Sequence, residues 1–419
     1  MHDLKALRRD PEAFATQMAR RNIDTSVIDK LMAADVVTRA AEGALGDANA
    51  AIRRNAEAFG KAKRQGVTTD VLADDGRRLG EDAAACEERA RETKAVRDTI
   101  VLALPNALRD DVPVGADEHD NIVQFTSVGD PEHMPQAVPQ RPHWESGPAF
   151  GMDMEAGTLL GGSRTTVLRG PLARLERVLG QWMLELHVNE HGYEEVSVPH
   201  LVRDEIMQGT GQLPKFEDDL FRAGERWLIP TAEVPLTNLA RIWHTQLHPM
   251  RLVALTPCYR AEAGKAGRDT RGMLRQHQFN KVEMVSVVPA AEAADEHARM
   301  TGCAERVLTL LGLTWRRVLL CAGDTGFSAS ITYDLEVWMA GTGEWREISS
   351  VSDCGTFQAR RMGLKGVLPH TLNGSGVAVG RALVALLENY VDAEGVLRLP
   401  RPLWDRMGTQ EMRPRLTIA

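Results

Sequence analysis

The chain has 419 residues and a formal net charge of −8, with 26% charged and 43% hydrophobic residues, a balance that is ordinary for a folded protein and excludes a largely disordered one. Its length favours two domains. No apolar run approaches the roughly 20 residues needed to cross a bilayer, and the first residues lack the apolar stretch of a signal peptide, so we expect a cytoplasmic protein. The five cysteines have no CxxC spacing, which argues against a zinc site or a disulfide framework.

The first hundred residues have the pattern of two long helices. Apolar or small residues recur at steps of three and four over residues 27–59, and the pattern resumes over residues 79–100 after an interruption that begins at Gly66. The simplest interpretation is an antiparallel helical hairpin, whose first helix would be roughly 50 Å long at about 1.5 Å per residue. We therefore predict an N-terminal arm at residues 1–104 and a second domain at residues 105–419.

The charge near the predicted turn of the hairpin opposes that of the whole chain. Residues 53–78 contain seven basic and four acidic residues, a local net charge of +3. By itself this pattern favours a solvated helical face, because charge runs are common on exposed helices. The alternative is an arm that contacts the phosphates of a nucleic acid, and the spacing does not decide between the two.

The second domain has the pattern of an α+β fold. Several prolines predict loops over residues 105–150. Several strands separated by loops, with a late helix, then indicate a mostly antiparallel β-sheet with flanking helices. The pattern predicts helices at residues 172–191 and 378–390, and strands at residues 193–198, 251–259, 279–288 and 333–339.

One segment of this domain, residues 257–283, has the composition of a polyphosphate site. The chain lacks the GxxxxGK[ST] and GxGxxG fingerprints of the common nucleotide-binding loops. Here two strand-like ends instead flank a glycine-rich loop with many arginines, whose planar forks suit phosphate oxygens. Surface solvation would explain such a loop equally well. The basic residues are Arg260, Lys265, Arg268, Arg271 and Arg275.

Two segments together carry a family resemblance. Residues 257–283 resemble motif 2 of class II aminoacyl-tRNA synthetases, and Thr231-Ala-Glu-Val-Pro-Leu-Thr237 resembles the serine-binding segment of seryl-tRNA synthetases of the bacterial type. The resemblance implies a helical hairpin followed by a class II catalytic domain. It also implies a serine–tRNA ligase that activates L-serine with ATP and transfers it to the 3′ end of tRNA(Ser), with selenocysteine tRNA as a further candidate. Other stretches similar to the family's are residues 210–216, 333–338, 346–350, 357–361 and 371–381.

The resemblance also assigns roles to single residues. Arg260, Glu262 and Arg381 would be catalytic: Arg260 would stabilise the charge that grows at the α-phosphate, and Arg381 would cover the adenine ring. Glu347 and Ser350 would help to hold Mg²⁺. The implied serine-binding residues are Thr231, Ala232, Glu233, Arg260, Glu283 and Ser375. The implied ATP-binding residues are Arg260, Ala261, Glu262, Arg275, Glu347, Ile348, Ser349, Ser350 and Arg381.

For macromolecular partners, the resemblance implies tRNA on the arm and a second copy of the chain. Residues 191–199 are similar to motif 1, which builds the dimer interface of class II synthetases, so a homodimer is expected. The candidates for contact with tRNA are Arg53, Arg54, Lys61, Lys63 and Arg64. His277, beside the basic loop, is expected to be structural.

Some features differ from the family pattern and leave rival functions to weigh. Ile331 replaces a frequent basic residue, Val351 replaces a frequent cysteine, and residues 362–370 form a short stretch, which raises the question of altered ATP kinetics. One rival is a specialised paralogue, which either loads serine or a related amino acid onto a carrier protein or is a second synthetase that tolerates an inhibitor; carrier-loading relatives tend to lack the hairpin. The other rival is a noncatalytic RNA-binding relative, against which the retained Arg260 and Arg381 argue.

Overall fold

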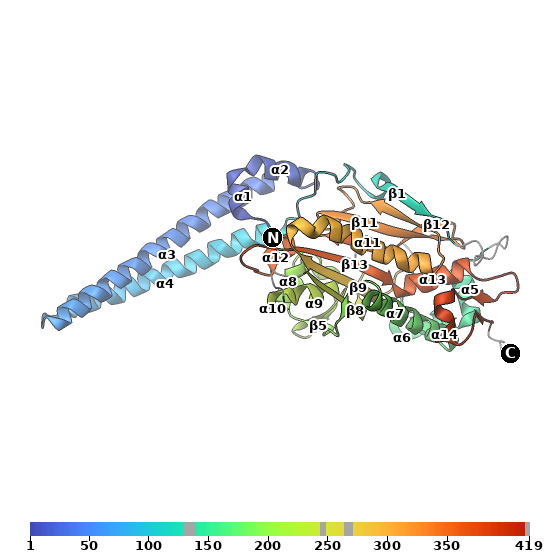
Figure 1. The fold of residues 1–419 in the computed structure, drawn as a ribbon. Coiled ribbons are helices and arrows are strands. Elements are labelled where there is room, and N and C mark those ends of the chain that lie inside the picture. Colours follow the sequence, from blue (N-terminus) through green and yellow to red (C-terminus); the bar gives the residue numbers. More distant parts are fainter. Residues whose placement is uncertain (130–139, 244–248, 264–270, 415–419) are drawn as a thin grey trace. The chain divides into compact units, whose positions relative to one another are not determined.

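The computed structural model describes residues 1–129, 140–243, 249–263 and 271–414 (Figure 1). The chain forms two compact units, Met1–Pro105 and Asn106–Ala419, and the boundary lies one residue beyond the predicted end of the arm. None of the helices in the described ranges combines the length and the apolar character that a bilayer crossing requires.

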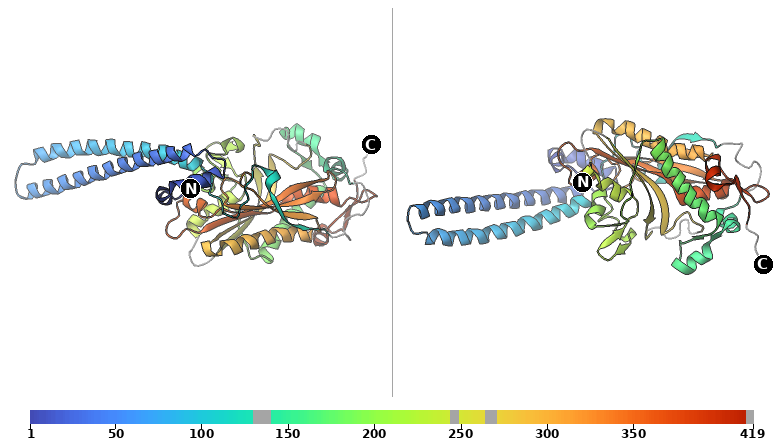
Figure 2. Two further views of the ribbon diagram at one scale, coloured as in Figure 1. Left: turned by 90° about the horizontal axis from the view of Figure 1, so that it is seen from above. Right: turned by 60° about the horizontal axis from the view of Figure 1, so that its bottom comes forward.

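The first unit is a helical hairpin with two short helices at its base. Helices α3 (Ser26–Arg64) and α4 (Asp70–Ala103) run antiparallel and side by side, as both views of Figure 2 show. At about 1.5 Å per residue, the 39 residues of α3 span roughly 58 Å, somewhat more than predicted. The short helices are α1 (Leu4–Arg9) and α2 (Pro11–Ala19).

Burial in this hairpin is concentrated at its base. The buried residues of α3 all lie between Ile28 and Ala41, and none follows in the remaining turns of that helix. At the base, the carboxylate of Asp35 is almost fully buried and accepts two hydrogen bonds from Arg8, at 2.7 and 2.8 Å. The hydroxyl of Thr38 donates to the carbonyl of Thr93 across the two helices. The distal part of the hairpin therefore presents most of its side chains to solvent.

The second unit is built on an eight-stranded sheet. All neighbouring strands in it are antiparallel except β4 and β8, which pair in parallel. In spatial order the strands are β1 (Ile122–Ser127), β10 (Trp315–Leu319), β11 (Ile331–Met339), β12 (Glu344–Asp353), β13 (His370–Ala378), β9 (Gln278–Val288), β8 (Met250–Tyr259) and β4 (Glu194–Glu195). Shorter strands are β2 (Met152–Asp153), β3 (Val167–Leu168), β5 (Leu201–Val202), β6 (Arg222–Ala223), β7 (Arg226–Leu228), β14 (Leu397–Arg398) and β15 (Glu411–Met412).

Helices cover both faces of this sheet. Three long ones, α7 (Pro171–Asn189), α11 (Ala293–Leu310) and α13 (Val379–Asn389), pack on one face, and α9 (Glu233–Asn238) packs on the other. The shorter helices are α5 (His143–Ser146), α6 (Met154–Gly161), α8 (Asp204–Thr210), α10 (Ala240–Trp243), α12 (Phe357–Arg361) and α14 (Trp404–Met407).

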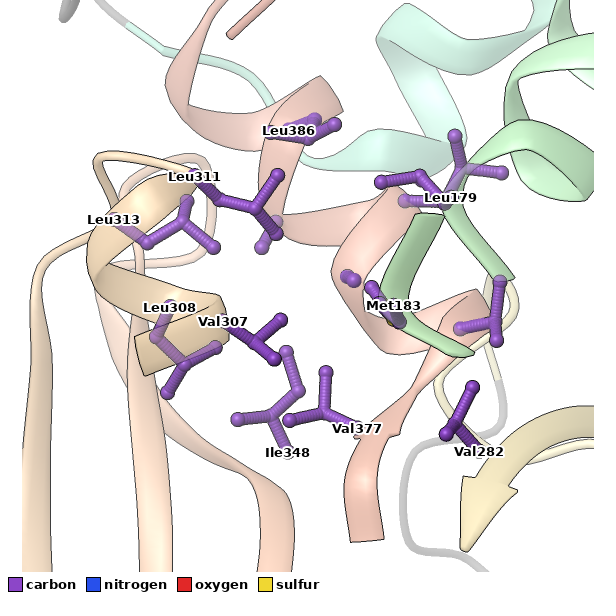
Figure 3. Packing of buried hydrophobic residues seen from close by; sticks show 14 of the residues in the cluster. Leu179, Met183, Val282, Val307, Leu308, Leu311, Leu313, Ile348, Val377 and Leu386 are labelled. Carbon is purple, nitrogen blue, oxygen red and sulfur yellow. The ribbon is translucent and has the colours of Figure 1, made fainter. Parts of the chain in front are cut away.

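The main core lies between the sheet and the three long helices. In α7 the buried residues follow helical spacing and include Leu175, Leu179 and Met183. Truncating one fully buried leucine of this kind to alanine costs about 2–5 kcal/mol of stability. Figure 3 shows side chains from the helices and strands meeting in this core, among them Leu179, Met183, Val282, Val307, Leu308, Ile348, Val377 and Leu386.

The predicted α+β class with its helical hairpin and mostly antiparallel sheet is confirmed, whereas two details of the prediction were wrong. The strand predicted at residues 193–198 is reduced to Glu194–Glu195. The region predicted to be loops contains β1, which pairs with β10 at the sheet edge. Three further strands of the eight-stranded sheet, β10, β12 and β13, were not predicted, and neither were the short strands outside that sheet.

Candidate active site

Two adjoining cavities, of about 980 and 320 Å³, lie in the second unit. They form one continuous site, because Glu233, Arg260, Arg275 and Arg381 line both of them. The smaller cavity reaches Thr231 and the charged residues Lys281 and Glu283 of β9, and the larger one extends along β11 and β12.

Strand alternation decides which side chains reach this site. In β9, Val282 and Met284 belong to the main core, so the odd-numbered Lys281 and Glu283 point to the opposite face of the sheet. The register of the neighbouring strand then places Ser375 directly opposite Glu283. Residues far apart in the chain thus meet on one face of the sheet.

The structure brings most of the predicted substrate-binding residues together at this site. Those that line the cavities are Thr231, Glu233, Arg260, Glu262, Arg275, Glu283, Glu347, Ile348, Ser350, Ser375 and Arg381. Three others do not line them. Ala232 is fully buried, Ala261 is partly exposed beside the smaller cavity's Arg260 and Glu262, and buried Ser349 donates its hydroxyl to the carbonyl of Ser375 at 2.5 Å.

The acidic end of the site holds two buried carboxylates in different surroundings. Glu283 forms an ion pair with Lys281 at 2.7 Å, and the Lys281 ammonium also donates to the hydroxyl of Thr231 at 2.9 Å. Glu233 accepts hydrogen bonds from the amides of Gln358 at 2.7 Å and Asn373 at 3.1 Å. Among the residues that the structure describes, Glu233 has no ion-pair partner, so the two carboxylates differ in how their charge is balanced.

Burial dominates the proton equilibrium of Glu233. Desolvation, reinforced by the negative charge of Glu283, raises the pKa of Glu233 to about 7. The hydrogen bond from Gln358 acts in the opposite direction but is outweighed. A ligand that carries a positive charge into this pocket would relieve the same penalty.

The middle of the site is held by Arg260 and by the turn that follows it. The guanidinium of Arg260 donates to the carbonyl of Pro230 at 3.3 Å and lies over the ring of Phe279, 5.2 Å from its centroid. Two residues later, Glu262 has a left-handed backbone (φ 54°), a conformation that costs a non-glycine residue about 1–3 kcal/mol. Its carboxylate pairs with Arg275 at 3.1 Å. Strain of this kind is typical of functional sites.

Arg381 lies at the first turn of α13 and contacts two other parts of the site. It donates to the carbonyl of Glu347 at 2.7 Å and to the carbonyl of Leu274 at 3.4 Å, and it also lies 3.4 Å from the Glu347 carboxylate. These contacts connect α13, β12 and the segment that ends the basic loop.

A second group of carboxylates lines the larger cavity on β11 and β12. Asp334 is directly opposite Ser350 in the strand register, and one oxygen of its carboxylate, Oδ1, is buried without a hydrogen-bond partner among the described residues. Burial, and then the negative charge of Glu347, raise the pKa of Asp334 well above its usual value. No cluster of three or more metal-binding side chains occurs in the described ranges. Oxygen donors that are crowded and incompletely paired fit a divalent cation such as Mg²⁺ that takes its other ligands from a substrate.

Several predicted features lie beside the site or outside the described residues. His277 hydrogen-bonds through Nδ1 with the carbonyl of Arg260 at 3.0 Å, which is a structural contact. Lys265 and Arg268 fall within residues 264–270, which lie outside the described ranges. Ile331 and Val351 are both fully buried and pack in hydrophobic clusters, and neither lines a cavity. These two departures are therefore core substitutions and do not touch the site.

The basic residues of the arm lie in the other unit. Five basic residues of α3 are exposed to solvent: Arg53, Arg54, Lys61, Lys63 and Arg64. Within the described residues none of the five has an ion-pair partner, whereas Arg77 and Arg78 near the same turn pair with Asp74 and Asp75.

Comparisons with known proteins give this geometry a family. Two family models match the chain: the seryl-tRNA synthetase N-terminal domain over residues 1–108 and the class II tRNA synthetase core domain (G, H, P, S and T) over residues 215–390. The chain is 51% identical to the serine–tRNA ligase of Rhodospirillum centenum, over 98% of this chain and 99% of that one. It is 52% identical to the serine–tRNA ligase of Acidiphilium cryptum, over 96% and 98%. The chain belongs to the seryl-tRNA synthetase family.

The structural comparison agrees. A crystal structure of seryl-tRNA synthetase from Pyrococcus horikoshii, complexed with ATP, superposes with a TM-score of 0.87 at 29% identity and covers 99% of this chain and 100% of that one. The family, the fold class and the aminoacyl-tRNA ligase activity on serine predicted from the sequence are confirmed. The roles of single residues stay predictions.

Four residues of the site were not singled out from the sequence. Lys281, Asp334, Gln358 and Asn373 all lie within stretches that resemble the family's, so the signal was present in the motifs. Only the fold shows that Gln358 and Asn373 orient Glu233, and that Asp334 faces Ser350.

Proposed function

We propose that the chain catalyses both steps of serine–tRNA ligation. The carboxylate of L-serine attacks the α-phosphorus of ATP, pyrophosphate leaves, and a hydroxyl of the terminal ribose of tRNA(Ser) then attacks the seryl-adenylate and releases AMP. The single observation that carries this proposal is the site itself, in which two buried glutamates face three arginines within one continuous cavity. Acidic groups suit the ammonium and hydroxyl of serine, and arginines suit phosphates.

The two glutamates divide the recognition of serine between them. Glu233 has no cationic side chain within ion-pairing distance among the described residues, so it takes the substrate ammonium. Glu283 is already neutralised by Lys281 and accepts the substrate hydroxyl, with Thr231 and Ser375 beside it. A pocket that hydrogen-bonds a substrate hydroxyl can reject an analogue without it by on the order of 10⁴ to 10⁵, so alanine is excluded without editing.

Three arginines bind the ATP. Arg260, between the two halves of the site, holds the serine carboxylate and the α-phosphate, where negative charge grows during attack. Arg275 meets the outer phosphates from its place beside Glu262, and Arg381 covers the adenine ring. Ala261 and residues 348–349 contribute backbone near the nucleotide. Catalysis then rests on positioning and on charge stabilisation and needs no protein nucleophile.

Mg²⁺ is the divalent cation that fits the carboxylates of the larger cavity. Glu347 and Ser350 would hold it, and the unpaired oxygen of Asp334 marks that residue as a further donor. When bound there, the ion would supply positive charge against the phosphates of ATP and of the leaving pyrophosphate.

The arm binds tRNA. Arg53, Arg54, Lys61, Lys63 and Arg64 are exposed and lack ion-pair partners within the described residues, which suits contact with backbone phosphates. The substrate is tRNA(Ser), and selenocysteine tRNA is a second candidate. Residues 191–199 belong to a homodimer interface, and the cytoplasm, where tRNA is charged, is the place of action.

The test is serine-dependent ATP–pyrophosphate exchange, followed in the same preparation by charging of bulk bacterial tRNA with labelled serine. Both reactions are expected. Exchange without charging would favour the carrier-loading paralogue, and the absence of both would favour a noncatalytic relative.

A further inference from the structure

A fully buried histidine and glutamate lie outside the lining of both cavities. His143 of α5 and Glu388 of α13 are each 0% exposed, and Nδ1 of the histidine lies 2.6 Å from Oε1 of the glutamate. The backbone N–H of His143 donates to the same oxygen at 3.2 Å. The other oxygen, Oε2, accepts the backbone N–H of Thr342 at 3.0 Å and its hydroxyl at 3.2 Å. The buried carboxylate therefore receives four hydrogen bonds, which offset the loss of its hydration.

The third contact of the histidine fixes its tautomer. The backbone N–H of Met273 donates to Nε2 of His143 at 3.0 Å. Because a backbone N–H can only donate, Nε2 must offer its lone pair, and the ring proton must then sit on Nδ1, where it is donated to Glu388. The imidazole is thus a fixed bridge from the Glu388 carboxylate to the backbone of Met273.

Gly272 shows how closely the backbone meets the ring. Its backbone is left-handed (φ 73°), and a Cβ atom added there would lie 1.9 Å from Nε2 of His143. Only a glycine allows this approach. The contact between residues 272–273 and the imidazole is therefore built into the chain.

The bridged segment continues directly into the nucleotide side of the site. Residues 274 and 275 follow Met273: the carbonyl of Leu274 accepts from Arg381, and Arg275 pairs with Glu262. Glu388 lies seven residues after Arg381 on α13, so both lie on the same side of that helix, about 10 Å apart along it. Helix α13 therefore holds residues 272–275 at two points, once through Arg381 and once through Glu388 and His143.

We propose that His143, oriented by Glu388, is a positioning residue for ATP: it holds the backbone at Met273 so that Arg275 and Arg381 keep their places. The proposal rests on the proposed function. The serine pocket has its own hydrogen-bond network, made by Gln358, Asn373 and Lys281, and none of these contacts involves the histidine. Loss of the bridge should therefore weaken ATP binding and leave serine binding nearly unaffected.

Two substitutions separate the contacts of the imidazole. The amide N–H of His143→Asn can replace the Nδ1 donor to Glu388 but leaves no acceptor for Met273. The longer His143→Gln can place its amide oxygen near the position of Nε2 and keep that acceptor. In the full-length protein, ATP–pyrophosphate exchange should show KM for ATP raised roughly 10-fold by His143→Asn, with KM for serine within about twofold, and KM for ATP largely rescued by His143→Gln.

Other outcomes overturn the proposal. The proposal is wrong if His143→Asn leaves both KM values unchanged, if it raises both by the same factor, or if the two variants have equal effects. In each of these cases His143 and Glu388 would contribute only to the packing of the core. Circular dichroism and the melting temperature establish that the variants are folded. If neither folds, Thr342→Val decides, because it removes one donor to Glu388: an ATP-selective rise of about threefold supports the proposal, and no change rejects it.

Calorimetry with ATP separates this proposal from the proposed function. Wild-type protein that binds ATP but shows no exchange would overturn the ligase assignment, while weaker ATP binding by His143→Asn would still support the positioning role. Wild-type protein that does not bind ATP would overturn both.

Discussion

The two units of this protein use charge in opposite ways. On the distal half of the arm, charged side chains are exposed to solvent, and the five basic residues Arg53, Arg54, Lys61, Lys63 and Arg64 have no ion-pair partner among the described residues. In the catalytic unit, carboxylates such as Glu233, Glu283 and Glu388 are buried under 10% exposure and depend on specific donors. An exposed charged group keeps its hydration, so it costs little free energy of folding. A buried charged group loses its hydration and is stable only where specific hydrogen-bond donors or ion-pair partners replace the lost water. We therefore expect each substitution of a charged residue on the arm to reduce activity by a modest amount. A single substitution of a buried charged residue in the site should reduce activity strongly.

The largest effect that this difference between the two units predicts is that of Arg260→Ala. Because Arg260 is proposed to hold the α-phosphate, where negative charge would grow during attack, we expect exchange activity to fall on the order of 10³-fold while the fold and the binding of tRNA persist. Arg226→Ala, at an exposed arginine on β7, is the matched control and should retain activity. If Arg260→Ala formed seryl-adenylate at a nearly normal rate in a single turnover, the proposed role of Arg260 at the α-phosphate would be wrong.

A shortened arm should separate the two reactions. Replacing residues 46–85 with a short Gly-Ser linker removes the exposed part of the hairpin and keeps the buried base, including Asp35 and the Thr38–Thr93 hydrogen bond. We expect charging to fall about 100-fold because the shortened arm no longer reaches the tRNA phosphates, with exchange within about twofold of wild type. An equal decrease of both reactions would contradict an arm that serves tRNA alone.

Within the arm, removing basic residues that have no ion-pair partner among the described residues should weaken tRNA binding more than removing basic residues that are already paired. The triple change of Lys61, Lys63 and Arg64 to alanine removes three cations that lack ion-pair partners among the described residues, so KM for tRNA should rise at least about tenfold. The dependence of log affinity on log salt should become shallower by about one for each phosphate that the arm no longer neutralises. The double change of Arg77 and Arg78 to alanine is the control, because Asp74 and Asp75 already offset those charges. Similar effects of both variants would favour a merely solvated face.

The same contrast explains how much could be predicted from the sequence. The hairpin was predictable because steps of three and four express helical geometry directly, and the long strands β8, β9 and β11 and the helices α7 and α13 were predicted close to their observed bounds. Strand β13 was missed because Asn373, Gly374 and Gly376 interrupt its apolar pattern, and β12 was missed because polar residues on its site face dilute the signal. In both strands, polar residues that line the candidate site, together with glycines in β13, replace the alternating apolar residues by which a strand is recognised in a sequence.

The candidate site was predictable only through the family resemblance. No local pattern indicates that Glu283 pairs with Ser375, which is 92 residues away and is set opposite it by sheet register. The same is true of Gln358 and Glu233, 125 residues apart. Such contacts depend on which strands become neighbours, a property of the whole fold, so a sequence read in short windows cannot supply them.

The smallest predicted effect tests the buried charge at its most sensitive point. Burial and the nearby Glu283 raise the pKa of Glu233 to about 7, so below this pH the carboxyl is protonated and cannot pair with the serine ammonium. KM for serine should therefore fall about fivefold as pH rises from about 6 to 7 and about twofold more by about pH 8, where it levels off, while KM for ATP changes little. Glu233→Gln should show a high serine KM that is flat over the same range.

Stability should follow the opposite trend. With the folded pKa of Glu233 raised from 4.5 to about 7, the folded state binds this proton more tightly than the unfolded state, so this group's contribution to the free energy of unfolding decreases as pH rises between those values. The change should be absent in Glu233→Gln, as measured by urea unfolding across the range. A serine KM that improves with pH while this contribution to stability declines would show that the buried carboxylate is kept for the ligand and not for the fold; a flat serine KM in the wild type would place the ammonium elsewhere.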